Sequence, residues 1–186
     1  MSLTHYGGQY MSRVHVAVAV ALCVFMVQLP LAAQSFASDE PISGRRSAMS
    51  LDTAKAIIAP FYDVLNKPAT KNVAETIKKC VHPDWRSYAG ENLSKGRDEF
   101  IAQVIGFGKL IPDLTWDIKE VLVDGDRVIV RSEASGTPSG NFFSVPHSGK
   151  RFKVMTIDIH TVKEGKLATA YHVEDWASAM RQLSSK

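Results

Sequence analysis

The part of the sequence that most constrains the fold is its C-terminal third, where four long segments rich in β-branched residues follow one another. Strands are expected over 115–123, 127–137, 151–162 and 167–174. Within these segments apolar and polar residues alternate, which is typical of strands with one buried face. Asp124-Gly125 and Glu164-Gly165 separate two pairs of them, and such dipeptides favour tight β-hairpins. The pattern predicts an antiparallel sheet.

The segment before these strands has helical periodicity. Apolar residues recur every three or four positions over 51–65, and Ser50 or Asp52 is available as the N-cap. A short helix is expected over 73–79 and a longer one over 97–110. Helices followed by a run of antiparallel strands predict an α+β domain, with the helices on one face of a bent sheet.

The N-terminal segment 1–37 has the pattern of a secretory signal peptide. Arg13 precedes an apolar run over 16–27, and Ser35-Phe36-Ala37 offers small residues for cleavage. Met11 is an alternative start. The apolar run is short for a membrane-spanning helix. We therefore expect a secreted or periplasmic protein without a stable membrane anchor.

The rest of the chain fits one domain. Residues 38–49 are polar and without periodicity, which indicates a flexible lead-in to a domain over 50–186. Cleavage would leave Cys80 as the one cysteine, so no intrachain disulfide could form and a buried thiol is expected. The net charge of +3 is spread without a basic block, so nucleic-acid binding is not expected.

One carboxylate, that of Asp158, lies within an otherwise apolar, β-branched segment. Burying a charged carboxylate is costly, so this group is paired, protonated, turned to solvent or held for chemistry. Arg131 and Lys153 are candidates for a structural ion pair. Alternatively, burial would raise the pKa of Asp158 and make it a better base for removing a proton beside a carbonyl group. The residues alone leave both roles open.

The turn near Glu164-Gly165 decides which residue lies beside Asp158. If Lys163 belongs to a three-residue loop, His172 lies on the face of Asp158 as a diagonal neighbour. There it could orient Asp158 or donate to a carbonyl oxygen as negative charge develops. A two-residue turn would instead pair Asp158 with Tyr171 and turn His172 to the other face. We favour the longer loop because it gathers the apolar side chains of both strands on one face.

Several short motifs carry a family resemblance. They are FYDVLN at 61–66, VHPDW at 81–85, IPDLTW at 111–116, GDRVIVR at 125–131 and GTPSG at 136–140. Together they resemble the SnoaL-like polyketide cyclases of the nuclear-transport-factor-2-like superfamily, over residues 51–183. The resemblance implies a cone-shaped, bent antiparallel sheet with N-terminal helices packed on its concave face, enclosing an apolar pocket.

The resemblance also implies a reaction. Asp158 matches the family's acid/base residue for an intramolecular aldol-type ring closure of a polyketide-like carbonyl compound, a reaction that needs no cofactor. One departure concerns Pro138, which stands where many members carry a histidine in the GTPSG stretch. A donor to the pocket is therefore absent from that position.

Further residues are candidates for binding an apolar or aromatic carbonyl ligand. An aromatic wall could come from Trp85, Tyr88, Trp116, Phe142 and Phe143, although aromatic residues also serve as plain core. Tyr171 is also a candidate for binding the ligand, because it is the alternative neighbour of Asp158. His160 shares the face of Asp158 but lies nearer the turn, where we expect exposure.

Two functions remain in view. A cofactor-independent acid/base enzyme is favoured, and a secreted module that binds a small apolar ligand without catalysis is the alternative. No metal is expected, because the histidines lack ligand spacing with a nearby acid. Either function is compatible with a homodimer formed through the apolar face of Met155, Ile157 and Ile159.

Overall fold

The structure is a computed structural model that describes residues 49–185. Its elements in chain order are α1 (Leu51–Leu65), a 3-10 helix η1 (Pro68–Thr70), α2 (Val73–Cys80), β1 (Val81–Gly90), β2 (Leu93–Gly96), α3 (Arg97–Leu110), β3 (Thr115–Asp124), β4 (Arg127–Gly136), β5 (Phe152–Lys163), β6 (Lys166–Glu174) and α4 (Trp176–Ser184). The predicted signal peptide and nearly all of the lead-in lie outside the described residues. Within 49–185 no helix is long and apolar enough to cross a membrane.

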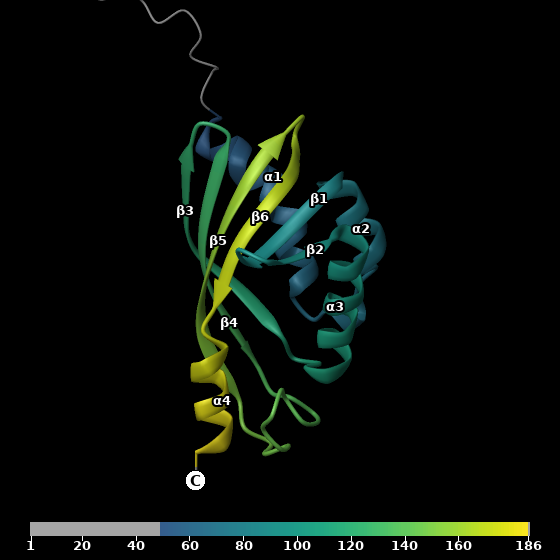
Figure 1. Cartoon of the computed structure of the whole chain (residues 1–186), viewed down its shortest axis with the longest axis vertical. Coiled ribbons are helices and arrows are strands. Elements are labelled where there is room, and N and C mark those ends of the chain that lie inside the picture. The colour runs from purple at the N-terminus through teal and green to yellow at the C-terminus, as the bar shows by residue number, and fades with distance from the viewer. Residues whose placement is uncertain (1–48, 186) are drawn as a thin grey trace, which may run out of the picture. The chain divides into compact units, whose positions relative to one another are not determined.

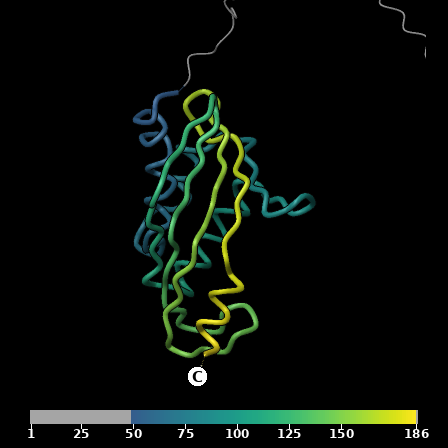
Figure 2. Tube along the Cα trace, turned by 90° about the vertical axis from the view of Figure 1, so that its left-hand side faces the viewer, coloured from purple at the N-terminus to yellow at the C-terminus, as the bar shows by residue number. Residues whose placement is uncertain are grey.

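Six strands form one curved sheet in the order β2-β1-β6-β5-β4-β3. The β1–β6 pairing is parallel, and the other four pairings are antiparallel. In Figure 1 the long strands β3 to β6 bend beside α1, α2 and α3, which all lie on one side of the sheet. Figure 2 shows the same four strands face-on, with the tip of the β1–β2 hairpin projecting to one side. The α+β class and the bent sheet with helices on its concave face are confirmed.

Helix α1 has a local sequence reason for both its start and its buried face. The Ser50 side chain caps it by accepting a hydrogen bond from the backbone N–H of Thr53. Ala54, Ile58 and Phe61 are buried at helical spacing, and Tyr62 is buried next to them. The helix therefore presents an apolar stripe to the sheet that carries one polar atom, the hydroxyl of Tyr62.

The strands after Pro112 and the helix over 97–110 agree with the sequence prediction to within two residues at their ends. Four elements were not predicted, namely η1, β1, β2 and α4. Strand β1 contains Pro83, and its pairing with β6 is irregular between Val81 and Arg86. Helix α4 begins where Asp175 accepts a hydrogen bond from the backbone N–H of Ser178.

The core lies between the helices and the inner face of the sheet. Along β5 the side chains of Phe152, Val154, Thr156, Asp158 and His160 share one face, as the strand alternation predicted, and all five are buried. Cys80 is a buried free thiol, and burial raises its pKa to about 11. The first glycine of GTPSG, Gly136, is required by packing, because a Cβ there would lie 2.3 Å from Cγ2 of Ile111.

Candidate active site

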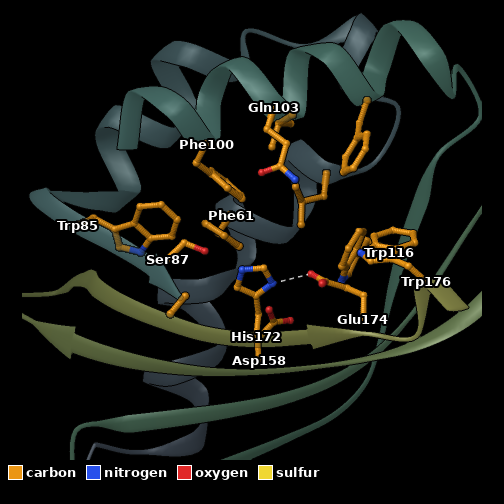
Figure 3. Close-up of a pocket in the computed structure, with 14 residues that line it drawn as sticks. Phe61, Trp85, Ser87, Phe100, Gln103, Trp116, Asp158, His172, Glu174 and Trp176 are labelled. Carbon is orange, nitrogen blue, oxygen red and sulfur yellow. Dashed lines mark hydrogen bonds and ion pairs between the residues drawn. The ribbon is translucent and has the colours of Figure 1, made fainter. Parts of the chain in front are cut away.

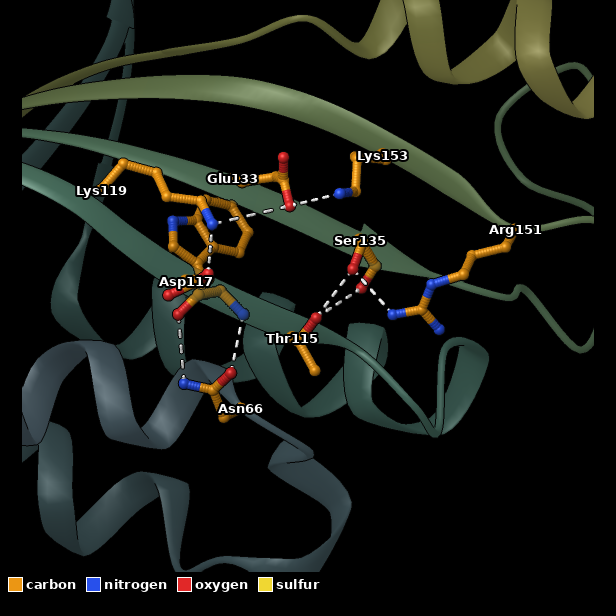
Figure 4. Close-up of polar contacts among 9 residues, drawn as sticks. Asn66, Thr115, Asp117, Lys119, Glu133, Ser135, Arg151 and Lys153 are labelled. Carbon is orange, nitrogen blue, oxygen red and sulfur yellow. Dashed lines mark hydrogen bonds and ion pairs between the residues drawn. The ribbon is translucent and has the colours of Figure 1, made fainter.

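Asp158 lies in the middle of β5 with its side chain on the inner face of the sheet and only 7% exposed. The suggested ion pairs with Arg131 and Lys153 do not form. Arg131 instead contacts Glu120 at 3.0 Å. Lys153 contacts Glu133 at 2.9 Å (Figure 4). Residues 131 and 153 are out of phase with residue 158 in the strand alternation, so both cations point to the other face. Asp158 is therefore buried without a lysine or arginine partner among residues 49–185.

The register between β5 and β6 places His172 directly opposite Asp158. The turn has only two residues, since Lys163 pairs with Lys166, so the expected three-residue loop is wrong. Ala168 then forms a bulge, because Thr161 pairs with Thr169 while Val162 pairs with Leu167. The extra residue shifts the register by one, so that His172 faces Asp158 despite the short turn.

The same bulge decides the position of Tyr171. This residue pairs with Ile159 on the outer face, where it is 49% exposed. Its ring stacks on that of Tyr88 with the ring centroids 4.7 Å apart. Tyr88 and Tyr171, both predicted to bind substrate, therefore lie on the opposite side of the sheet from Asp158.

On the side of α1, the hydroxyl of Tyr62 donates a hydrogen bond to Oδ2 of Asp158 over 2.9 Å. The same hydroxyl lies 2.9 Å from Nε2 of His160. His160 is fully buried, so its expected exposure near the turn is wrong. Helix α1 covers this part of β5 and shields the imidazole from water. His160 thus lies behind Asp158, in contact with Tyr62, and does not line the cavity.

On the side of β6, Nδ1 of His172 lies 2.7 Å from Oε1 of Glu174. The two residues share a strand face because they are two positions apart. Burial alone would lower the pKa of His172, but the hydrogen bond and charge of Glu174 and the charge of Asp158 raise it above its usual value. The other ring nitrogen, Nε2, is buried and has no hydrogen-bond partner within 49–185.

The pKa of Asp158 is strongly perturbed. Burial raises it to about 7, and the negative charge of Glu174 acts in the same direction. The hydrogen bond from Tyr62 and the charge of His172 oppose this rise. A carboxyl group with this pKa is present in both protonation states near neutral pH, which suits it for taking and returning a proton.

Asp158, His172 and Glu174 form the polar floor of a cavity whose walls are mainly aromatic (Figure 3). The other residues that line it are Phe61, Leu65, Trp85, Ser87, Phe100, Gln103, Val104, Phe107, Trp116, Ala170 and Trp176. The cavity volume is about 50 Å³, room for about three or four water molecules. A ligand larger than this requires the aromatic side chains to move apart.

Of the predicted aromatic wall, Trp85 and Trp116 line this cavity. Phe142 is buried elsewhere, where its ring stacks on Phe152 at 5.5 Å. Phe143, beside it, is 58% exposed. Both phenylalanines belong to the β4–β5 connection, which packs against α4 rather than over the Asp158 side chain.

Several residues in or next to the cavity were missed by the sequence reasoning. Glu174 could have been found, because it shares the face of His172 at a spacing of two. Gln103 and Trp176 come from α3 and α4, and nothing in their local sequence distinguishes them from surface or core residues. Tyr62 was included in the FYDVLN motif, but only the packing of α1 on β5 brings it to Asp158.

The three polar floor residues could also act as metal ligands. One ligand atom from each of Asp158, His172 and Glu174 lies within 4.8 Å of the others, a separation that a single cation could bridge. The sequence prediction of a metal-free site overlooked this cluster, since Glu174 was not considered. In this geometry Nδ1 of His172 bonds to Glu174 and Oδ2 of Asp158 to Tyr62, while Nε2 of His172 has no partner within 49–185.

The comparisons with known proteins agree with this fold. Solved structures with a similar fold include TsrD from Streptomyces laurentii, with 23% identity, a TM-score of 0.64 and coverage of 74% of this chain and 98% of that one. A candidate SnoaL-like polyketide cyclase from Jannaschia sp. CCS1 has 22% identity, a TM-score of 0.65 and coverage of 77% and 99%. AclR from Streptomyces galilaeus, a candidate hydroxylase, has 22% identity, a TM-score of 0.63 and coverage of 74% and 88%.

At these identities the likeness shows the fold, which is the nuclear-transport-factor-2-like α+β cone. The family follows from the sequence, because residues 57–183 match the model of the SnoaL-like polyketide cyclases. The chain belongs to the SnoaL-like polyketide cyclase family. A search of the curated proteins found no match. The structural neighbours include candidate cyclases and a candidate hydroxylase, so the fold alone does not define the reaction.

Proposed function

We propose that this protein is a cofactor-independent acid/base enzyme that closes a ring in a small carbonyl compound by intramolecular aldol addition. Asp158 is the acid/base residue. The observation that carries this proposal is a carboxyl group with a pKa of about 7, buried at the floor of an aromatic cavity and without a lysine or arginine partner in the described part of the chain. The small cavity favours a compact, polyketide-like substrate over a large polycyclic one.

The proposed reaction has two proton transfers and one carbon–carbon bond. The carboxylate of Asp158 removes a proton from a carbon next to one carbonyl group, which leaves an enolate. The enolate carbon attacks a second carbonyl carbon of the same molecule, and the ring closes. The resulting alkoxide takes the proton back from Asp158, so the product is an isomer of the substrate and the enzyme is unchanged.

His172 supports this chemistry as a donor to the enolate oxygen. Glu174 is bonded to Nδ1, so Nε2 is the ring nitrogen that remains for a ligand. In Figure 3 the ring nitrogen that is not bonded to Glu174 lies on the opposite side of the imidazole. Because its pKa is raised, His172 carries a proton on Nε2 over a wider pH range and can stabilise developing negative charge.

A secreted binding module without catalysis is the alternative. One prediction and one sequence feature favour it. The predicted export would separate the protein from the intracellular supply of unstable polyketide intermediates, and Pro138 replaces a histidine that many family members carry. The aromatic walls would then hold an apolar ligand, and Asp158 would have no chemical role.

The deciding experiment measures ring closure of 2,6-heptanedione to 3-hydroxy-3-methylcyclohexanone by NMR, both without and with the chelator EDTA. Asp158→Asn should lower the rate by about 10²- to 10⁴-fold, while binding of the diketone, followed by tryptophan fluorescence, stays unchanged. Asp117→Asn is the matched control, because Asp117 is exposed.

Each outcome has a distinct meaning. Binding without acceleration by the wild-type protein would favour the binding module. Equal rates in wild type and Asp158→Asn would contradict the assignment of Asp158. Loss of the rate on chelation, with recovery on adding Zn²⁺ or Mn²⁺, would assign Asp158, His172 and Glu174 to a metal site instead.

A further inference from the structure

The hydroxyl of Tyr62 lies between a carboxylate oxygen and an imidazole nitrogen, and it has one proton to donate. Its oxygen is 2.9 Å from Oδ2 of Asp158 and 2.9 Å from Nε2 of His160. If Tyr62 donates to Asp158, Nε2 of His160 must carry a proton and donate to Tyr62. If Tyr62 donates to His160, the imidazole proton moves to Nδ1, and Oδ2 of Asp158 loses its donor.

The protonation states of these groups limit the choices. Burial lowers the pKa of His160 to about 3, so the ring is neutral and carries one proton. Burial and the adjacent Asp158 raise the pKa of Tyr62 well above 10, so its hydroxyl keeps its proton. Phe61 packs edge-on against the imidazole with ring centroids 5.3 Å apart, which restrains its rotation.

Two costs oppose the reversed order, in which Tyr62 donates its proton to His160. Nδ1 of His160 is buried and has no partner within 49–185. It is therefore an unpaired acceptor when Nε2 carries the proton and an unpaired N–H donor in the reversed order, and buried unpaired N–H groups are the rarer of the two in proteins. In the reversed order an ionised Asp158 would also lose its hydrogen bond from Tyr62. A hydrogen bond to a charged acceptor is stronger than one to a neutral acceptor. The order His160 Nε2–H to Tyr62 to Asp158 avoids the unpaired N–H and keeps the hydrogen bond to the carboxylate.

This order has a consequence for Asp158. Oδ2 is occupied as an acceptor in either protonation state of the carboxyl group. Oδ1 accepts no hydrogen bond from the described residues, and Asp158 lines the cavity. We propose that Tyr62 and His160 are positioning residues that lock the direction of hydrogen bonding at Asp158, so that protons enter and leave through Oδ1 alone.

The catalytic role of this hydrogen-bond order rests on the proposed function, because it concerns the same carboxyl group of Asp158. The charged and titratable groups that act on Asp158 are Tyr62 from α1 and His172 and Glu174 from β6. Lys95 from β2 acts on His172. Any test by pH must therefore separate the contribution of Tyr62 from that of the β6 pair.

The first test is the tautomer of His160 in the wild-type chain. NMR of the ¹⁵N-labelled imidazole distinguishes a protonated from an unprotonated ring nitrogen. The proposal expects Nε2–H, both below and above pH 7. A proton on Nδ1 at either pH would overturn it. Since this measurement uses neither a variant nor turnover, it holds even if the protein catalyses no ring closure.

The second test compares variants by ¹³C NMR titration of the Asp158 carboxyl group. Tyr62→Phe removes the bond that lowers its pKa, so the midpoint should move to higher pH, and kcat at pH 7 should fall roughly 10-fold. His160→Leu removes the donor to Tyr62 and should shift the midpoint in the same direction, by less. His160→Gln offers an N–H at a similar reach and should restore wild-type behaviour.

The controls separate the possible failures. A Glu174→Gln variant alters the charge on the β6 side but leaves the Tyr62 bond, so its His160 tautomer should match the wild type. If His160→Leu and His160→Gln titrate alike, the positioning role of His160 is wrong. If the titrations behave as expected but no variant changes kcat/KM, the positioning stands and the proposed reaction fails.

Discussion

Tyr62 of α1 donates a hydrogen bond to Asp158 of β5 over 2.9 Å, although the two residues are 96 positions apart in the sequence. The bond reaches the carboxyl group from behind, while His172 faces it from the neighbouring strand. Asp158 is thus held between a neutral donor and a histidine that is itself bonded to a second acid, Glu174. This arrangement allows a buried carboxyl group to have a pKa close to neutral pH without an ion pair to a lysine or arginine.

Asp158 should make folding stability depend on pH in a predictable direction. Its pKa is about 7 in the folded protein and near 3.8 in the unfolded chain. Between these values the folded state keeps a proton that the unfolded chain has lost, so stability falls as pH rises from 4 to 7. The Asp158→Asn variant has no such loss of stability. Its free energy of unfolding should therefore increase relative to that of the wild type by up to about 4 kcal/mol between pH 4 and pH 8.

The measurement is urea denaturation of both proteins at several pH values. His160 contributes the opposite slope, because its lowered pKa costs stability as pH falls from 6.5 to about 3. This contribution is present in both proteins and should cancel in their difference. A stability difference that is constant with pH would mean that Asp158 titrates normally.

The rate of ring closure should follow the ionisation of Asp158. The carboxylate is the base, so kcat should rise about tenfold per pH unit below pH 7 and level off above it. At higher pH the rate should fall again as His172 loses the proton that it offers to the enolate. The pH profile of kcat tests this. An unchanged rate from pH 5 to pH 9 would exclude Asp158 as the base.

His172 and Glu174 should act as a unit. His172→Ala removes the donor and should lower kcat about 10- to 100-fold. Glu174→Gln can still accept a hydrogen bond from Nδ1 but loses its charge, so the pKa of His172 should fall and kcat should drop by less. NMR titration of His172 and kcat are measured together. His147→Ala, in an exposed loop, is the matched control, and equal activity in His172→Ala would remove His172 from the mechanism.

Two glycines of α3 should respond oppositely to alanine. A Cβ on Gly108 would lie 2.7 Å from the backbone nitrogen of Ala69, which cannot move aside easily. Gly108→Ala should therefore cost about 1–3 kcal/mol. At Gly106 a Cβ meets no atom within 4 Å, so Gly106→Ala should stabilise the helix by about 0.5–1 kcal/mol. Thermal denaturation of the two variants compares them, and equal midpoints would contradict the close packing of α3 on η1.

Some of the site was predictable from the sequence because it depends on local patterns. Strand alternation placed Asp158 and His160 on one face of β5, and the motifs indicated the family and the bent sheet. The buried location of Cys80 followed from its residue type. Export stays a prediction, since the segment 1–48 lies outside the described residues, and dimer formation through the face of Met155 stays a prediction as well.

The sequence by itself determined the order of the main elements, the family and the identity of the central acid, because hydrophobic periodicity and turn residues act over a few positions. Tertiary structure decided what surrounds that acid. The Ala168 bulge shifts β6 by one residue and places His172 and Glu174 in the cavity while turning Tyr171 outward. The packing of α1 on β5 brings Tyr62 to Asp158 and buries His160. Both depend on which arrangement buries the most apolar surface with its polar groups satisfied, and that balance is reached only between segments far apart in the chain.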